Sequence, residues 1–361
     1  MTGEHRIVVL GAGYAGLAAA RQAARARGVR VTVIDTRTEL VERVRLHQLL
    51  AGQQIPRWNL REMLECKGIQ FIQGKAIDID TAARQVRLED APPVSYDSLV
   101  YALGSVADVG GVPGVAEYAH SVATPEDVRR ASALSGRVAV VGGGSTGIET
   151  ATELAEARPD LTVLLVSAEE PGAWLSDKAR THIRAVLERL GVEVHAGAKV
   201  AEVTADGLEL VGGASLSAET VLWTAGFAVP ELAARSGLAV DPRGRVLVDG
   251  ELRSRSHPEV YAVGDSAVMT GPEDRELRMA CATALPAGKY AATALTARLA
   301  GKTPAPRRFR YVLQCVSLGR RDAIVQFVHA DDAPARTVLT GRTAAWVKEQ
   351  IVRTAGSSAR P

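Results

Sequence analysis

Residues 7–17 read IVVLGAGYAGL, a run of four apolar residues followed directly by three glycines spaced as GxGxxG. The apolar run predicts a short buried strand, and the alanine-rich stretch 17–27 predicts a helix. A second apolar strand, residues 29–34, ends at Asp35. Strand, glycine turn, helix and strand together form the beginning of a doubly wound α/β domain.

The three glycines have different mechanical roles in such a turn. Gly11 permits the tight turn, Gly13 lets the backbone approach a pyrophosphate, and Gly16 allows close packing of the helix. The helix N-terminus favours negative charge, and Asp35 stands where a carboxylate accepts hydrogen bonds from an adenosine ribose. A glycine-rich turn without a ligand is the alternative, and the setting between strand and helix argues against it.

The same unit recurs later in the chain. The strand 138–141 leads into GGGSTG at 142–147, and a helix from 148 to about 157 precedes a strand at 162–166. Two copies of one supersecondary unit predict two dinucleotide-binding domains.

The residue after the second strand differs between the two copies. Ser167 takes the place of Asp35, and a serine neither binds a ribose as firmly as a carboxylate nor repels a 2′-phosphate. NADH and NADPH therefore both remain open as ligands of the second domain. The neighbouring Glu169 and Glu170 slightly favour NADH.

The order of elements predicts an α/β fold with two doubly wound, Rossmann-like dinucleotide-binding domains and a small C-terminal α+β domain. From residue 304 onward the pattern changes to isolated strands and a closing helix around 344–353, which we expect to dock on its own protein rather than on a membrane. The predicted limits are residues 1–125 and 246–302 for the first domain, 126–245 for the second and 303–361 for the third.

Composition excludes several classes of protein. The 361 residues are 47% hydrophobic, which suits two or three buried cores, and the net charge of +2 with no dense basic run argues against nucleic-acid binding. No apolar stretch approaches the roughly 20 residues of a transmembrane helix, and the polar start leaves no room for a signal peptide, so we expect a cytoplasmic protein. Cys66, Cys281 and Cys315 are too far apart for a CxxC pair or a metal site.

Several motifs together carry a family resemblance over nearly the whole chain. Besides the two glycine motifs these are YALGS at 101–105, WTAG at 223–226 and VYAVGD at 260–265. In these motifs and their order the chain resembles the flavoproteins of the pyridine nucleotide-disulfide oxidoreductase superfamily, in particular the branch of type II NADH dehydrogenases and apoptosis-inducing-factor-like oxidoreductases. The resemblance implies that the first domain binds FAD and that the second binds NADH or NADPH as co-substrate.

The resemblance also implies site residues. Gly11, Gly13, Gly16, Asp35 and Asp265 would bind FAD; Gly142, Gly144 and Gly147 would bind the pyridine nucleotide; and the same motifs add Ala15, Ala102, Gly104, Thr146, Gly226 and Gly264. Glu149 matches an acidic residue that lies near nicotinamide and flavin in this superfamily, although a helix-stabilising first-turn acid is the alternative. The implied enzyme passes hydride from nicotinamide to flavin N5 and then electrons to a quinone-like or other small acceptor.

The chain departs from the family in two places. The stretch 42–50 lacks the CxxxxC pair of the disulfide reductases, which excludes a dithiol relay there. The stretch 279–288 lacks the glutamines of type II NADH dehydrogenases, which counts against a membrane quinone. Candidates for the acceptor side are His47, Gln48, Tyr311 and Gln314, with His47 as the catalytic candidate beside Glu149, although a lone histidine is usually structural. Cys281 could also touch the flavin, although core packing is the commoner role.

Two other functions stay open at this point. A protein electron carrier such as a ferredoxin could be the acceptor, received by the basic residues Arg307, Arg308, Arg310, Arg320 and Arg321. A flavin-based redox-sensing or binding protein is the other possibility. A homodimer is compatible with either, and no metal site is expected.

Overall fold

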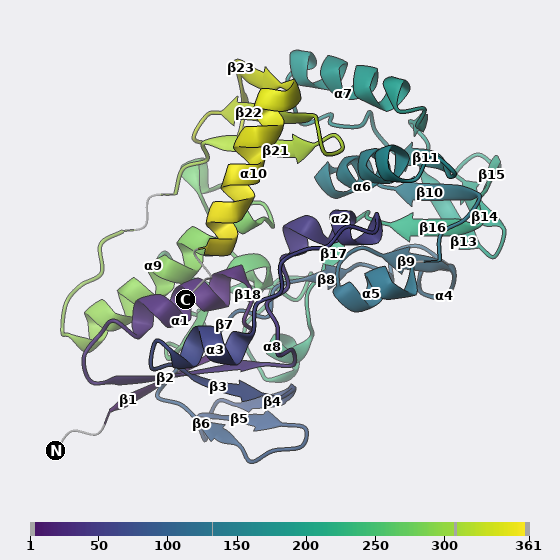
Figure 1. Ribbon diagram of the computed structural model, residues 1–361. Coiled ribbons are helices and arrows are strands. Elements are labelled where there is room, and N and C mark those ends of the chain that lie inside the picture. Colours follow the sequence, from purple (N-terminus) through teal and green to yellow (C-terminus); the bar gives the residue numbers. More distant parts are fainter. Residues whose placement is uncertain (1–3, 132, 307–308, 358–361) are drawn as a thin grey trace.

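The computed structural model describes residues 4–131, 133–306 and 309–357 (Figure 1). Its first domain is built on a five-stranded parallel sheet. Its strands are β1 (His5–Leu10), β2 (Val29–Asp35), β3 (Gln70–Gln73), β7 (Ser98–Tyr101) and β19 (Val260–Ala262). The order is β19-β7-β1-β2-β3, with all neighbours parallel. The chain therefore enters at the centre of the sheet, and β1 ends at the first glycine turn, as in a doubly wound domain.

Two helices of this domain cross beside the glycine turn. Helix α1 (Tyr14–Ala23) follows β1, and α9 (Cys281–Leu299) packs against it. The contact is close because Gly288 has no side chain, and a Cβ there would collide with the carbonyl oxygen of Ala15. The crossing brings the N-terminus of α9 next to the glycine turn.

The second sheet repeats the plan of the first. Its strands are β9 (Ala119–Ser121), β10 (Arg137–Val141), β11 (Thr162–Ser167), β12 (Glu193–Ala196) and β16 (Thr220–Trp223). The order is β12-β11-β10-β16-β9, again with all neighbours parallel. Helix α6 (Ser145–Ala157) follows the second glycine turn, and α7 (Asp177–Arg189) begins at Ser176, whose side chain accepts a hydrogen bond from the Ala179 N–H.

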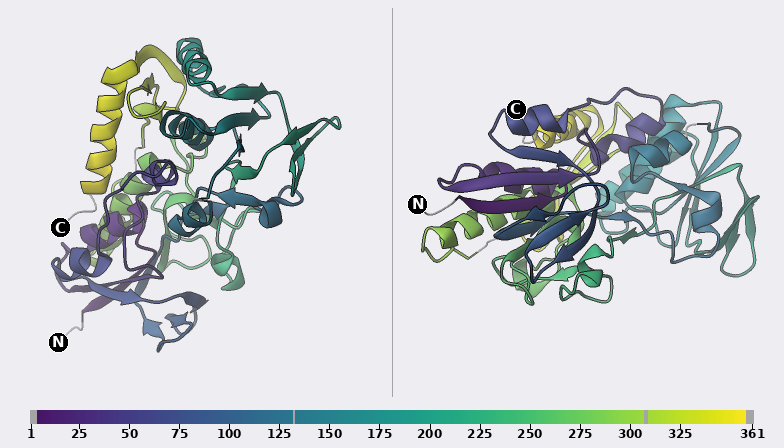
Figure 2. Two further views of the ribbon diagram at one scale, coloured as in Figure 1. Left: turned by 45° about the vertical axis from the view of Figure 1, so that its right-hand side comes forward. Right: turned by 90° about the horizontal axis from the view of Figure 1, so that it is seen from below.

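The C-terminal unit is an antiparallel sheet with one helix, as the sequence predicts. Strands β21 (Leu313–Ser317), β22 (Ala323–Val328) and β23 (Pro334–Thr340) pair in that order. Helix α10 (Gly341–Ser357) packs across β22, and in Figure 1 it runs from this sheet toward α9. The left view of Figure 2 shows the same helix along one edge of the molecule, running from the C-terminal sheet toward the helices of the first domain.

The remaining elements are short and lie around the two main sheets. The strands are β4 (Ala76–Asp80), β5 (Gln85–Leu88), β6 (Val94–Ser95), β8 (Val106–Ala107), β13 (Val200–Thr204), β14 (Gly207–Leu210), β15 (Ser215–Ser217), β17 (Phe227–Ala228), β18 (Val246–Leu247) and β20 (Ala267–Val268). The helices are α2 (Leu46–Leu50), α3 (Leu60–Glu65), α4 (Val115–Tyr118), α5 (Pro125–Arg130) and α8 (Leu232–Arg235), with 3-10 turns at Arg43–Arg45, Gly264–Ser266 and Pro272–Asp274.

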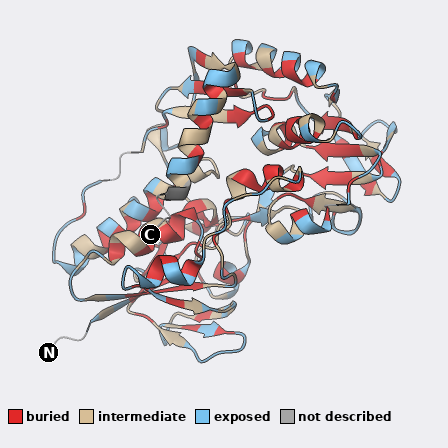
Figure 3. Cartoon of the chain, in the orientation of Figure 1, coloured by how far each residue is buried: buried red, intermediate tan, exposed pale blue. Residues whose placement is uncertain are grey.

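Burial shows how the three parts are joined (Figure 3). One core forms around β1, α1 and α9, and another around β10, α6 and α7. Val316 and Ile324 of the C-terminal sheet belong to the second core, and so do Leu46 and Leu50 of α2. Helix α2, which precedes the second domain in the chain, is therefore fixed against it. This packing holds His47 at the junction.

The fold class predicted from the sequence is confirmed, whereas the domain limits stay a proposal. Strand β9, before residue 126, pairs in the second sheet, and α8, before residue 245, contributes Leu232 to the first core. Arg307 and Arg308 of the basic cluster lie outside the described residues.

Neither a membrane-spanning helix nor a metal centre is present in the described part of the chain. No helix in it has both the length and the apolar character needed to cross a bilayer. Within the same ranges, no group of His, Cys, Asp and Glu side chains is arranged to hold a metal ion.

Candidate functional site

One large cavity, of about 1170 Å³, lies where the two Rossmann-like domains and α10 meet. We call it the main cavity. Many of the site residues predicted from the sequence line it. Those of the first domain are Gly11, Gly13, Ala15, Asp35, Ala102, Gly104, Gly264 and Asp265, and those from later motifs are Thr146, Glu149 and Gly226. His47 also lines it, so both catalytic candidates face the same space.

The first glycine turn is built as its sequence predicts. Gly11 has φ +97°, and a Cβ there would lie 2.9 Å from the Ala102 carbonyl carbon. A Cβ on Gly16 would collide with the carbonyl oxygen of Gly11, so this glycine allows the helix to pack. A Cβ on Gly13 would meet no atom within 4 Å. Gly13 therefore borders open space in the main cavity, where backbone can approach a ligand.

Two carboxylates face this cavity: Asp35 at the end of β2 and Asp265 in the 3-10 turn Gly264–Ser266. The Ala12 N–H donates to Asp35 Oδ2 at 2.6 Å, so the carboxylate is fixed beside the glycine turn. The Ser105 hydroxyl donates to Asp265 Oδ2 at 2.7 Å. Arg43 reaches the same place: its Nη1 lies 3.9 Å from Asp265 Oδ2, and its guanidinium stacks over the Phe227 ring. Sequence reasoning assigned no role to Arg43, because nothing local connects it with a residue more than 200 positions away.

The second glycine turn repeats the arrangement. Gly142 has φ +125°, a Cβ on Gly147 would collide with the Gly142 carbonyl oxygen, and a Cβ on Gly144 would meet nothing within 4 Å. Of these, none lines the main cavity, whereas Thr146 and Glu149 on the first turns of α6 do. The turn thus supports α6 and leaves open space beside Gly144, where a ligand can approach the protein backbone.

The residues that would choose between NADH and NADPH lie at the end of β11. Ser167 is buried, and its hydroxyl oxygen lies so near Gly143 that a Cβ there would collide with it. Glu170 accepts a hydrogen bond from Arg184 at 2.7 Å in an exposed pair. Because Arg184 is engaged in this way, a 2′-phosphate would have to compete with Glu170 for it.

The thiols near the N-terminus of α9 are inert. Cys281 and Cys315 both line the main cavity, and burial raises the pKa of each thiol, that of Cys315 to about 12. Neither cysteine is in a disulfide, and the raised pKa values keep both thiols protonated at neutral pH.

We expect the variants Cys281→Ser and Cys315→Ser to keep steady-state NAD(P)H oxidation within about threefold of wild type, because a protonated thiol is a poor nucleophile. Turnover with ferricyanide measures this. A loss of activity beyond a hundredfold in either variant, with FAD still bound, would show that a thiol takes part in the chemistry.

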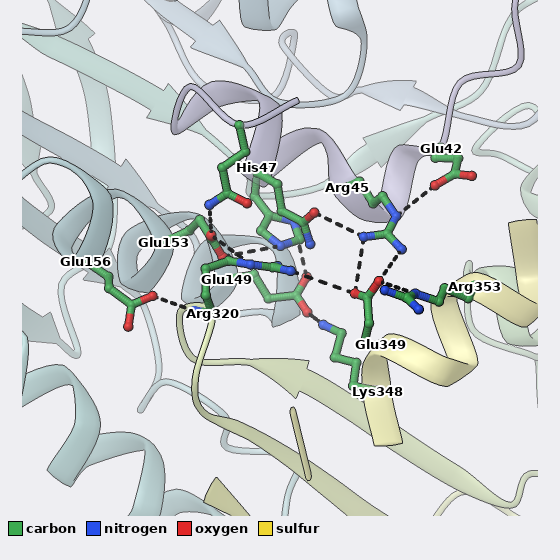
Figure 4. A network of polar contacts seen from close by, with 12 residues as sticks. Glu42, Arg45, His47, Glu149, Glu153, Glu156, Arg320, Lys348, Glu349 and Arg353 are labelled. Atoms are coloured by element: carbon green, nitrogen blue, oxygen red, sulfur yellow. Dashed lines mark hydrogen bonds and ion pairs between the residues drawn. The ribbon is translucent and has the colours of Figure 1, made fainter. Parts of the chain in front are cut away.

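A cluster of polar side chains joins all three parts of the molecule beside the main cavity (Figure 4). Lys348 of α10 forms an ion pair with Glu149 Oε1 of α6, and the Ser317 N–H donates to the same oxygen at 3.0 Å. His47 lies next to this pair, with Nδ1 3.9 Å from Glu149 Oε2, and its Nε2 lies 4.0 Å from Glu153 Oε2. We call Lys348, Glu149, His47 and Glu153 the junction cluster.

Burial decides the protonation of the junction cluster. It lowers the pKa of the Lys348 ammonium to about 7, with a further contribution from the positive charge of Arg45. It holds the pKa of His47 well below the usual value, helped by Lys348, Arg320 and Arg45, so the imidazole is neutral. It raises the pKa of the Glu153 carboxyl. Lys348 and His47, two groups with shifted pKa values, line the main cavity beside the buried Glu153, which is typical of a reaction site.

A second ion-pair group holds the helices that carry this cluster. Arg45 donates to Glu42 at 2.8 Å and to Glu349 of α10 at 2.9 Å, and Glu349 also accepts from Arg353 at 2.9 Å. The closing helix therefore docks on its own protein, as predicted. Its Trp346, however, is 66% exposed.

The other candidates for the acceptor side, Gln48, Tyr311 and Gln314, do not share one site. Gln314 lines the main cavity, but both ends of its amide are already hydrogen-bonded. Its oxygen accepts from the Trp174 ring N–H at 2.7 Å, and its nitrogen donates to Asp332 at 2.8 Å. The Tyr311 hydroxyl accepts from the Arg278 N–H at 2.8 Å and does not line the cavity. Gln48 borders a different, smaller cavity. Sequence reasoning missed Lys348 and Glu153; a lysine among the apolar residues of the closing helix was the signal available for Lys348.

Comparison with known proteins gives matches over most of the chain. Residues 5–288 match the family described as pyridine nucleotide-disulphide oxidoreductase. The NADH dehydrogenase-like protein Rv1812c of Mycobacterium tuberculosis is 32% identical over 368 aligned residues, covering 92% of this chain and 91% of that protein. The Type II NADH:quinone oxidoreductase Ndh of the same bacterium is 28% identical over 359 residues, covering 85% and 76%. The structure of the sulfide:quinone oxidoreductase from Aquifex aeolicus shares the fold, with a TM-score of 0.82 at 20% identity over 97% of this chain and 90% of that one.

Proposed function

The chain belongs to the pyridine nucleotide-disulphide oxidoreductase family, and from this premise we propose that it is an FAD-dependent NAD(P)H dehydrogenase whose acceptor is a quinone or a quinone-like small molecule. Hydride would arrive from a nucleotide on the second domain, and the electrons would leave to an acceptor beneath α10. We expect NADH as the preferred donor, because Glu169 and Glu170 follow β11 and Arg184 is already paired. A cytoplasmic location belongs to the same proposal.

The residues of the main cavity fit FAD. Open space beside Gly13 suits a pyrophosphate, Asp35 suits the adenosine ribose, and Asp265 suits the ribityl chain. Helix α9 begins at the cavity, with Cys281 and Ala282 in its wall, and the positive end of its dipole suits the electron-rich flavin ring. When bound, FAD would supply the hydride and electron chemistry of the reaction, and the protein would position the partners and exclude water.

The observation that carries the choice of acceptor is the Lys348–Glu149 pair in the wall of the main cavity. The surrounding wall is apolar, with Leu285, Leu313, Val347 and Ile351, and so suits a flat apolar ring. Reduction of a quinone by NAD(P)H takes up one proton per turnover. Lys348, with its pKa near 7, can donate that proton to a carbonyl oxygen of the acceptor.

Steady-state assays with three acceptors test this proposal. With NADH as donor, a short-chain quinone such as menadione should give fast turnover, whereas an acidic ferredoxin should give little. Fast reduction of the ferredoxin that falls steeply with salt, together with slow quinone reduction, would contradict the proposal and favour the protein carrier. Ferricyanide, which needs no proton, reports whether flavin reduction works in either case.

The pH profile of quinone reduction follows from Lys348. Below pH 7 the ammonium carries its proton and can donate it; above pH 7 it is deprotonated, so the rate should fall about tenfold per pH unit. His47 is already neutral in this range, so its titration does not change the rate near neutral pH. Stopped-flow rates of flavin reoxidation by menadione between pH 5.5 and 9 measure the profile. A rate that is flat across pH 7, or that rises above it, would contradict proton donation by Lys348.

A further inference from the structure

A second, smaller cavity lies beside the junction cluster and shares Lys348 with the wall of the main cavity. It has a volume of about 510 Å³, and we call it the surface cavity. Gln48, Arg320, Lys348 and Glu349 line it. The exposed Arg321 and Trp346 also border it, so it communicates with solvent.

Ionisable groups lie in series, 3.8–4.0 Å from one another, between the surface cavity and the Lys348–Glu149 pair. Arg320 in the wall of the surface cavity has Nε 3.8 Å from Glu153 Oε1. Glu153 Oε2 faces His47 Nε2 at 4.0 Å, and His47 Nδ1 faces Glu149 Oε2 at 3.9 Å. Glu149 contacts Lys348 at the main cavity. Figure 4 shows the series from Arg320 to Lys348 in one view.

Two atoms in the middle of this series are buried without a hydrogen bond. Among the described residues, neither His47 Nε2 nor Glu153 Oε2 has a partner, although His47 is 3% and Glu153 0% exposed. Buried polar atoms are normally paired, so two unpaired ones that face each other call for an explanation. A small side-chain rotation would bring them into hydrogen-bond contact, and a neutral imidazole can accept a proton on one nitrogen while it releases one from the other.

The charges around His47 suit such a transfer. Arg45 and Gln48 approach from its own segment, Glu149 and Glu153 from α6, Arg320 from the β21–β22 connection, and Lys348 and Glu349 from α10. Burial, and after it the nearby cations, lowers the pKa of His47 and keeps the imidazole neutral. Burial raises the pKa of the Glu153 carboxyl, which therefore holds a proton at a higher pH than an exposed carboxyl would. Gln53 donates to the other Glu153 oxygen and so fixes the carboxyl in place.

We propose that Glu153 and His47 carry protons from the surface cavity to the Lys348–Glu149 pair and so replenish the proton used at each turnover. The proposal rests on the quinone reductase function, in which NAD(P)H, one proton and a quinone give NAD(P)⁺ and a quinol. Lys348 Nζ gives its proton to the acceptor oxygen. A proton from solvent in the surface cavity passes Arg320, which lies between that cavity and Glu153, and protonates the Glu153 carboxylate. Glu153 then passes its proton to one nitrogen of His47, while the other nitrogen releases a proton to the pair.

The variant Glu153→Gln tests the route, because glutamine keeps the shape and the oxygen that accepts from Gln53 but carries no exchangeable acid proton. Flavin reduction by NADH should be unchanged, whereas flavin reoxidation by menadione should slow about tenfold or more and show a larger solvent isotope effect. The matched control is Glu156→Gln on the same helix, whose carboxylate accepts only from the Arg320 N–H at 2.5 Å among its described contacts. The Glu156 charge is the smallest of the causes that shift the Glu153 pKa, so this variant should keep both half-reaction rates and the solvent isotope effect within about twofold of wild type.

Infrared spectroscopy adds a readout that does not depend on turnover. A protonated-carboxyl band that changes when the flavin is reduced should be present in wild type and Glu156→Gln and absent in Glu153→Gln. The variant His47→Gln interrupts the same proton route at its next group. It should slow flavin reoxidation to a similar extent and keep the carboxyl band, because Glu153 is still present.

Each outcome bears on the proposal in a defined way. Wild-type reoxidation rates and isotope effects in Glu153→Gln would overturn the route and show that solvent reaches Lys348 directly through the surface cavity. The quinone function would survive that result. A wild-type protein that reduces ferricyanide but no quinone would overturn the acceptor and the route together.

Discussion

Replacing Lys348 by glutamine is expected to slow quinone reduction by about a hundredfold or more, while flavin reduction by NADH stays within about twofold of wild type. Lys348 is the one titratable group of the junction cluster that both lines the main cavity and has a pKa near 7. Glutamine can still donate a hydrogen bond but cannot release a proton. Separate stopped-flow measurements of the two half-reactions show which one is affected.

Two further variants make this result specific. Lys348→Arg keeps the positive charge opposite Glu149 but holds its proton too tightly to donate it, so it should fold well and still reduce quinone slowly. Lys289→Gln removes a lysine from the exposed side of α9 and should leave both half-reactions unchanged. Quinone reduction at the wild-type rate in Lys348→Gln would remove Lys348 from the chemistry.

The first glycine turn gives the other large effect. Gly16→Ala is expected to lower the free energy of unfolding by about 1–3 kcal/mol, because its methyl group collides with the Gly11 carbonyl oxygen. Gly13→Ala should leave the FAD-free protein as stable as wild type, because its methyl group enters open space. That space is where a pyrophosphate would approach the backbone, so FAD affinity should fall about tenfold or more. Flavin absorbance per polypeptide and thermal unfolding of the FAD-free protein measure the two effects.

Gly250→Ala is the matched control for both glycine variants. Gly250 lies outside the main cavity, and a Cβ there would meet nothing within 4 Å. This variant should match wild type in stability and in FAD content. If Gly13→Ala also retained full FAD content and affinity, FAD would not lie against this turn in the way proposed.

The sequence predicted the two doubly wound domains well because their signals are local. A strand, three glycines and a helix occupy about twenty consecutive residues, and Gly16 is required by its contact with the Gly11 carbonyl oxygen within that unit. Gly11 is required by its φ of +97° in the turn itself and by the distant Ala102 carbonyl. The predicted α+β character of the C-terminal part also follows from local patterns of strand and helix.

The junction cluster could be predicted only in part. His47 and Glu149 were candidates, one from its position near the expected flavin region and the other from its place after the second glycine motif. Their partners were not, because Lys348 pairs with Glu149 across 199 positions, and the pair exists only when α10 docks. The docking depends on Arg45 and Glu349, which meet across 304 positions.

Glu153 illustrates a different limit. In the sequence it is one of several acids on an amphipathic helix, and nothing separates it from the more exposed Glu156 one turn later. Only the packing of α2 and the C-terminal sheet over α6 buries it completely. Its pKa shift, and hence its suitability for holding a proton, arises from that packing.

Anaerobic double-mixing stopped flow tests the central claim most directly. The purified FAD-containing protein is first mixed with NADH, then with menadione, while the visible flavin band is recorded. We predict rapid bleaching in the first step and rapid recovery in the second, with NADH faster than NADPH. A flavin that NADH and NADPH both fail to bleach, or that bleaches but does not recover with any quinone, would contradict the account.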